Sequence, residues 1–143
     1  MTQEAAKKLS GAEVQAAFDR SPFIGWLGLK VVSLDHERQE LTVRMAMRPE
    51  LERRPGTRQF HGGPIAAFID TAGDWAVGML LGGGVPTVNL RTDYLRPGVG
   101  DGLTAVAHVR RMGKSTAVVD IEVLDDEKRL VALGRGTYAS TLG

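Results

Sequence analysis

The chain has 143 residues and a formal net charge of +1, and 43% of its residues are hydrophobic. These values fit one domain spanning residues 1–143, and the near-neutral charge gives no reason to expect nucleic acid as a partner. The absence of cysteine excludes disulfides, thiolate nucleophiles and cysteine metal sites. No N-terminal apolar run resembles a signal peptide, and no window approaches the roughly 18 apolar residues of a membrane span. We therefore expect a cytoplasmic protein without a membrane partner.

Helical structure is expected first, over about residues 10–27. Ser10 and Glu13 have the spacing of a capping box, which predicts a short helix to about Phe18. Pro22 suits the first position of a second helical segment, after which the chain becomes extended. Residues 40–47 alternate between apolar and polar side chains and predict a half-buried strand. A polar, arginine-rich loop follows over residues 48–60.

Residues 64–81 are the long helix candidate. A helical wheel places seven side chains on one broad apolar face, which predicts that this face is buried. Asp70 lies on the opposite face among small residues, and three glycines at 82–84 end the helix. The apolar set is Ile65, Phe68, Ile69, Ala72, Trp75, Ala76 and Met79.

The remainder of the chain predicts strands separated by short turns. The first has alternating Val88, Leu90, Thr92 and Tyr94, and three further β-rich runs cover about residues 103–112, 115–124 and 129–140. Strands that follow one another through short turns favour an antiparallel sheet, so the predicted class is α+β, with the long helix packed on the sheet.

The start of the long helix carries features of a site. Pro64 fits the first helical position and makes Gly63 a natural N-cap. The N–H groups of Gly62 and Gly63 are then expected to be free donors beside a helix N-terminus, as an oxyanion hole requires.

Asp70 is the candidate nucleophile or general base, but it is too far from these donors. Eight residues of helix correspond to roughly 12 Å, so one chain cannot bring both groups to one carbonyl. The small residues around Asp70 permit a second helix to approach, and an antiparallel two-fold pair would bring Asp70 of one chain to the glycines of the other. We therefore predict a homodimer with two shared sites. Asp74 is expected to be an exposed helix residue; the alternative is a like charge that raises the pKa of Asp70.

At these residues the sequence resembles the hotdog-fold acyl-CoA thioesterases of the phenylacetyl-CoA thioesterase type. Three stretches carry the resemblance, which covers roughly residues 24–140: HGGPIAAFIDTA, TVNLRTDYLRPG and RRMGKSTAVVDIEVLDDEKRLVALGRGTYAS.

The resemblance implies a long central helix wrapped by a curved antiparallel sheet, dimers that often pair into tetramers, and acyl-CoA hydrolysis with neither a metal nor a cofactor. Asp70 would be the nucleophile or general base, and the Gly62 and Gly63 N–H groups would polarise the thioester carbonyl. His61 would orient groups around the thioester, and Thr87 would help to hold the attacking water. Many relatives carry Asn or Gln where this chain has Pro55.

Basic residues offer contacts for the phosphates of coenzyme A. The resemblance points to Arg110, Arg111 and Lys114 at one turn, and Arg58 precedes the glycine loop. Two other functions remain open: a non-catalytic acyl-CoA-binding protein, and a hotdog hydratase or dehydratase acting on an enoyl thioester. The acyl group is not specified by the sequence.

Overall fold

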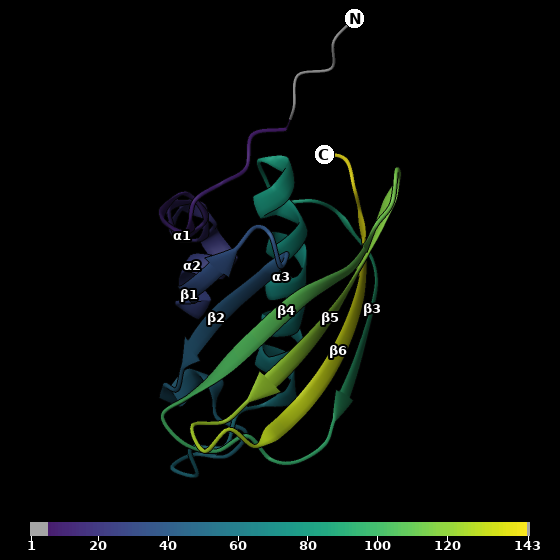
Figure 1. Cartoon of the computed structure of the whole chain (residues 1–143). Coiled ribbons are helices and arrows are strands. Elements are labelled where there is room, and N and C mark those ends of the chain that lie inside the picture. The colour runs from purple at the N-terminus through teal and green to yellow at the C-terminus, as the bar shows by residue number, and fades with distance from the viewer. Residues whose placement is uncertain (1–5, 143) are drawn as a thin grey trace, which may run out of the picture.

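The computed structural model describes residues 6–142 and consists of a curved antiparallel sheet that wraps around one long helix, α3 (Figure 1). The six strands pair in the order β1-β2-β4-β5-β6-β3, and each neighbouring pair is antiparallel. The α+β class and the wrapped helix predicted from the sequence are therefore confirmed. The elements are α1 (Gly11–Arg20), α2 (Pro22–Leu27), β1 (Lys30–Asp35), β2 (Glu40–Ala46), the short 3₁₀ helix η1 (Pro49–Leu51), α3 (Gly62–Leu81), β3 (Thr87–Tyr94), β4 (Gly102–Met112), β5 (Thr116–Leu124) and β6 (Leu130–Ala139).

The N-terminal segment contains the predicted capping box. Ser10 Oγ accepts the Glu13 N–H at 3.1 Å, and the Glu13 carboxylate accepts the Ser10 N–H at 3.2 Å. Strand β1 was not predicted as a separate element, because its sequence does not alternate cleanly. It is an edge strand, its pairing with β2 is irregular near Val31, and the next residue, Val32, is exposed.

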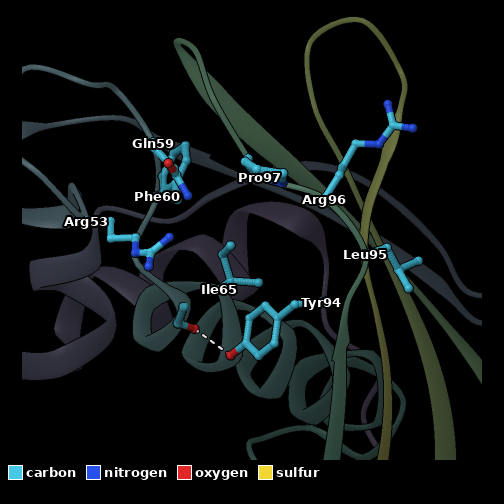
Figure 2. A pocket seen from close by; sticks show the side chains of 10 residues that line it. Arg53, Gln59, Phe60, Ile65, Tyr94, Leu95, Arg96 and Pro97 are labelled. Atoms are coloured by element: carbon cyan, nitrogen blue, oxygen red, sulfur yellow. Dashed lines mark hydrogen bonds between the residues drawn. The ribbon is translucent and has the colours of Figure 1, made fainter.

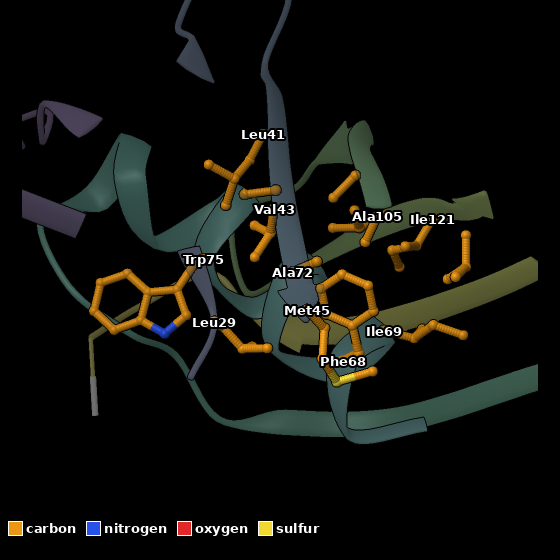
Figure 3. Close-up of a cluster of buried hydrophobic side chains, with 14 of the residues drawn as sticks. Leu29, Leu41, Val43, Met45, Phe68, Ile69, Ala72, Trp75, Ala105 and Ile121 are labelled. Atoms are coloured by element: carbon orange, nitrogen blue, oxygen red, sulfur yellow. The ribbon is translucent and has the colours of Figure 1, made fainter. Parts of the chain in front are cut away.

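Helix α3 supplies the centre of the hydrophobic core. All seven residues of its predicted apolar face are buried. Figure 3 shows Phe68, Ile69 and Ala72 in one cluster with side chains of β2, β4 and β5, whereas Trp75 packs edge-on against Phe18 of α1. Val77, which the helical wheel groups with Asp70, is buried as well. The helix ends at Gly82, whose φ of 101° lies in the left-handed region that glycine adopts readily.

Burial also explains why α3 is so apolar. By length and composition alone it could span a membrane, so the expectation that no stretch of the chain approaches a membrane span is wrong. However, 67% of this apolar stretch of α3 is buried inside the protein. The core helix of a globular fold can be as long and as apolar as a membrane span.

Candidate active site

The N-terminus of α3 is capped by a side chain rather than by a glycine. The prediction of Gly63 as the N-cap is wrong: the N-cap is His61, whose backbone is extended, and the helix begins at Gly62. His61 Nδ1 accepts the Gly63 N–H at 3.0 Å. An imidazole acceptor thus satisfies one of the N–H groups that a helix leaves unpaired at its start.

Only one of the two expected donors is therefore free. The Gly63 N–H is held by His61, whereas the Gly62 N–H has no acceptor among residues 6–142. Tyr94 Oη donates to the Gly62 carbonyl oxygen at 2.7 Å (Figure 2). This carbonyl and the Gly63 N–H belong to the same peptide unit, so His61 and Tyr94 fix that peptide from both of its polar ends.

Asp70 lies about two turns further along α3 and accepts hydrogen bonds from side chains of two strands, β3 and β6. Its Oδ1 accepts the Thr87 hydroxyl at 2.8 Å, and its backbone carbonyl accepts the Tyr138 hydroxyl at 3.2 Å. Tyr138 reaches this position because residue 73 is glycine, since a Cβ there would collide with Tyr138 Oη. Burial raises the pKa of Tyr138 far above its ordinary value, which keeps the hydroxyl neutral and able to donate.

An irregularity in β3 turns Thr87 toward Asp70. Tyr94 faces α3, and strict alternation would put Thr87 on the opposite face of the strand. The register shifts between Thr87 and Asn89, however, and the intervening Val88 is 63% exposed. The alternation predicted for Val88, Leu90, Thr92 and Tyr94 is therefore broken at its first residue, because the bulge turns Thr87 rather than Val88 toward α3.

Asp74, one turn after Asp70, is half-buried, so the expectation of an exposed residue is also wrong. Its Oδ1 accepts the Val85 N–H at 2.7 Å and ties the loop before β3 to the helix. Burial raises the pKa of Asp74 to about 7; the Val85 N–H opposes this shift, and the charge of Asp70 adds to it. Asp74 therefore holds a proton in part of the molecules at neutral pH.

The Gly62–Gly63 end of α3 and the Asp70 carboxylate lie along one solvent-accessible strip of the helix. Gly63 is exposed, and Ala66, Ala67 and Asp70 are partly exposed, while β3 beside them is an edge strand. Along the helix, Gly62 and Asp70 are separated by about 12 Å. One carbonyl cannot contact both groups in a single chain.

Two open hollows flank the start of α3. The first measures ≈ 360 Å³ and is lined by Gly62 and Ile65 of α3 together with Tyr94, Phe60, Arg53 and Arg96 (Figure 2). Gln59, close to the glycines, lines it too, whereas Pro55 does not. The second measures ≈ 340 Å³ and is lined by Gly63, Pro64 and Ala67 of α3 together with Phe23, Trp26, Glu50 and Glu52. The sequence favours residues 23–29 as part of the acyl pocket without placing their side chains, and Phe23 and Trp26 of that segment do line the second hollow. Sequence reasoning missed Tyr94 and Arg96 as site residues, because only the fold brings them to the helix start.

Three of the four basic residues expected to contact coenzyme A lie far from the Gly62 end of α3. Arg110, Arg111 and Lys114 surround the β4–β5 turn, which sits beside Pro86 and Thr87 near the C-terminal end of α3, away from Gly62 (Figure 1). Arg110 pairs with Asp120 at 3.4 Å, and Arg58 pairs with Asp101. Among residues 6–142, no group of three or more His, Asp or Glu side chains is placed to hold a metal ion.

Comparison with known proteins identifies the family of this chain. The model of the thioesterase superfamily matches residues 60–132, from the residue before His61 into β6. The chain belongs to the thioesterase superfamily, has its hotdog fold and is a hydrolase.

Individual relatives match between 77% and 96% of this chain. The acyl-coenzyme A thioesterase PaaI of Escherichia coli is 35% identical over 114 residues, covering 77% of this chain and 76% of PaaI. The medium/long-chain acyl-CoA thioesterase YigI of Escherichia coli is 29% identical over 153 residues, covering 96% of both. A crystal structure from the thioesterase superfamily superposes with a TM-score of 0.82 at 36% identity, covering 88% of this chain and 94% of that one.

Proposed function

We propose that the protein hydrolyses an acyl-CoA thioester to a free acid and coenzyme A, at a site shared by two chains. The observation that carries this proposal is the arrangement on α3: an unpartnered Gly62 N–H at the helix N-terminus and a fixed carboxylate, Asp70, about 12 Å away on the same open strip. The relatives PaaI and YigI, both named as acyl-CoA thioesterases, support the substrate class.

In the proposed reaction the thioester carbonyl lies against the Gly62 N–H of one chain. The positive end of the helix dipole and this donor stabilise the negative charge that develops on the carbonyl oxygen. His61 and Tyr94 keep the Gly62–Gly63 peptide in place. When His61 releases the Gly63 N–H, this group becomes a second donor to the carbonyl oxygen.

Asp70 of the partner chain supplies the base or the nucleophile. As a base, it takes a proton from water while the water oxygen bonds to the carbonyl carbon; the C–S bond then breaks, and the thiolate of coenzyme A takes up a proton. As a nucleophile, the Asp70 carboxylate bonds to the carbonyl carbon, the C–S bond breaks, and the thiolate of coenzyme A takes up a proton; water then hydrolyses the mixed anhydride, which releases the acid and restores Asp70. Both routes consume one water and release one acid and one thiol. The hydroxyl of Thr87 orients the carboxylate in either route.

The decisive variant is Asp70→Asn, which keeps the shape and the Thr87 contact but removes the base. We expect the release of thiol from a panel of acyl-CoA esters to fall by about 10²- to 10⁴-fold. Wild-type rates in this variant would contradict the role of Asp70. Tight binding of acyl-CoA by the wild-type protein without any thiol release would identify a binding protein instead.

A further inference from the structure

The two hollows at the start of α3 differ in chemistry. One is lined by two arginines and no acidic residue, whereas the other is lined by two glutamates and His61 but by no arginine or lysine. They share no lining residue. At 100° per residue, Gly62 and Ile65 point to one side of α3, and Gly63, Pro64 and Ala67 point to nearly the opposite side. Gly62, whose N–H has no acceptor among residues 6–142, lines the first hollow, and the next residue, Gly63, lines the second.

The basic hollow has cations available for a ligand. The guanidinium groups of Arg53 and Arg96 have no acidic partner among the described residues, in contrast to Arg58 and Arg110. Arg53 reaches toward the centre of the hollow and Arg96 extends away along its far rim (Figure 2). Between them lie the apolar side chains of Phe60 and Ile65, which can cover an uncharged chain.

The second hollow has an exposed aromatic wall. Phe23 and Trp26 stack with ring centroids 6.5 Å apart and an interplanar angle of 19°, yet they are 55% and 51% exposed. The Arg48 guanidinium lies 4.4 Å from the Trp26 ring centroid and holds the indole in place. At ≈ 340 Å³ the hollow exceeds the cavity of about 150 Å³ that accommodates benzene.

A CoA thioester has the same division, because it carries phosphates at one end and an acyl group at the other, with the reactive carbonyl between. We propose that the substrate lies across the start of α3, with the CoA arm and its phosphates in the Arg53–Arg96 hollow and an uncharged aryl or alkyl acyl group in the Phe23–Trp26 hollow. Glu52, which has no cationic partner among the described residues, disfavours the reverse orientation and acyl groups that end in a carboxylate, whereas Glu50 is paired with Arg48 at 3.8 Å. This inference rests on the proposed function and adds the direction of binding and the class of acyl group.

The test compares two carriers of the same acyl group, coenzyme A and N-acetylcysteamine, which lacks the phosphates. In the double variant Arg53→Gln/Arg96→Gln, we expect KM to rise about tenfold or more for the CoA ester and to stay unchanged for the N-acetylcysteamine ester. The double variant Lys8→Gln/Arg38→Gln removes the same charge at the other end of α3 and should change neither. An equal change on both carriers, or no change on either, would overturn the assignment of the basic hollow.

The acyl side is tested with Trp26→Ala and the conservative Trp26→Phe. We expect Trp26→Ala to lower kcat/KM for aryl and medium-length acyl groups about tenfold, by the same factor on both carriers, and Trp26→Phe to restore most of it. Glu52→Gln should improve hydrolysis of a carboxylate-ended acyl-CoA relative to its uncharged analogue. If Trp26→Ala changes the oligomeric state in sedimentation but leaves the ranking of acyl groups intact, the hollow belongs to a subunit interface and the proposal fails.

These outcomes are distinct from failure of the proposed function itself. If the wild-type protein hydrolyses neither carrier, the thioesterase proposal falls and this inference falls with it. If the wild-type protein hydrolyses both and only the Arg111→Gln/Lys114→Gln variant raises KM for the CoA ester, the hydrolase stands and the β4–β5 turn binds the phosphates.

Discussion

The two halves of the candidate site on α3 are built in opposite ways. At Gly62 the key group is a backbone N–H that is left free, and the side chains of His61 and Tyr94 hold the peptide next to it. At Asp70 the key group is a side chain that is already engaged, held by Thr87 and anchored through Tyr138. A backbone donor needs only a fixed peptide, whereas a carboxylate on a helix needs neighbours that fix its orientation.

The strongest way to separate the two halves is to remove the backbone donor alone. Gly62→Pro deletes the N–H at a first helical position, where proline is favoured, and His61 already has the extended backbone that a following proline requires. We expect kcat to fall about 10²- to 10³-fold with little change in stability. Gly62→Ala keeps the N–H and meets Tyr94 at 3.4 Å, so it is the matched control in the same thiol-release assay.

If the two halves come from different chains, two inactive variants should restore each other. In an equal mixture of Asp70→Asn and Gly62→Pro chains that have exchanged subunits, half of the dimers are mixed, and each contains one intact site. We expect about a quarter of wild-type activity in the mixture. A mixture that stays as inactive as its components, although mass spectrometry of the intact dimers shows exchange, would contradict a shared site.

Within the carboxylate half, Thr87→Val tests how much orientation matters. The substitution keeps the shape of the side chain and removes the hydrogen bond to Asp70. We expect kcat to fall roughly tenfold, the value of a hydrogen bond to a charged group, with KM nearly unchanged. Thr42→Val, a similar change in β2, is the control, and an equal loss of kcat there would indicate a general effect on the sheet.

The smallest expected effect concerns the stability of the carboxylate half. Because the pKa of Asp74 is raised to about 7 in the folded protein, folding favours its protonated form, and the free energy of unfolding falls as pH rises from about 4 to about 7. Asp74→Asn keeps an acceptor for the Val85 N–H and cannot ionise. Its melting temperature should therefore exceed that of the wild type by about 5 °C at pH 8 and by much less at pH 4.

A control variant separates this effect from a general change in surface charge. Glu37→Gln, in the exposed turn between β1 and β2, should show no such difference between the two pH values. A constant gap between Asp74→Asn and the wild type from pH 4 to pH 8 would contradict the raised pKa.

The sequence predicted those parts of the site that depend on helical periodicity. The buried face of α3 and the position of Asp70 on the opposite side follow from a regular 100° repeat. The parts it did not predict depend on neighbours far away in the chain. Tyr94 reaches Gly62 across 32 positions, and Thr87 meets Asp70 only because a bulge interrupts the alternation of β3. The N-cap is His61 rather than the predicted Gly63, because the His61 imidazole accepts the Gly63 N–H, and the helical pattern does not reveal this contact.

The regularity of α3 has a consequence for the stretch between its two functional ends. A straight helix carries Asp70 eight steps past Gly62, which advances it by about 12 Å and turns it by about 80°. One residue more or fewer between them would rotate the carboxylate by about 100°, away from Thr87 and into the core or the sheet. The number of residues in this stretch is thus constrained more tightly than their identity, and any relative that uses the same pair of groups must keep the count.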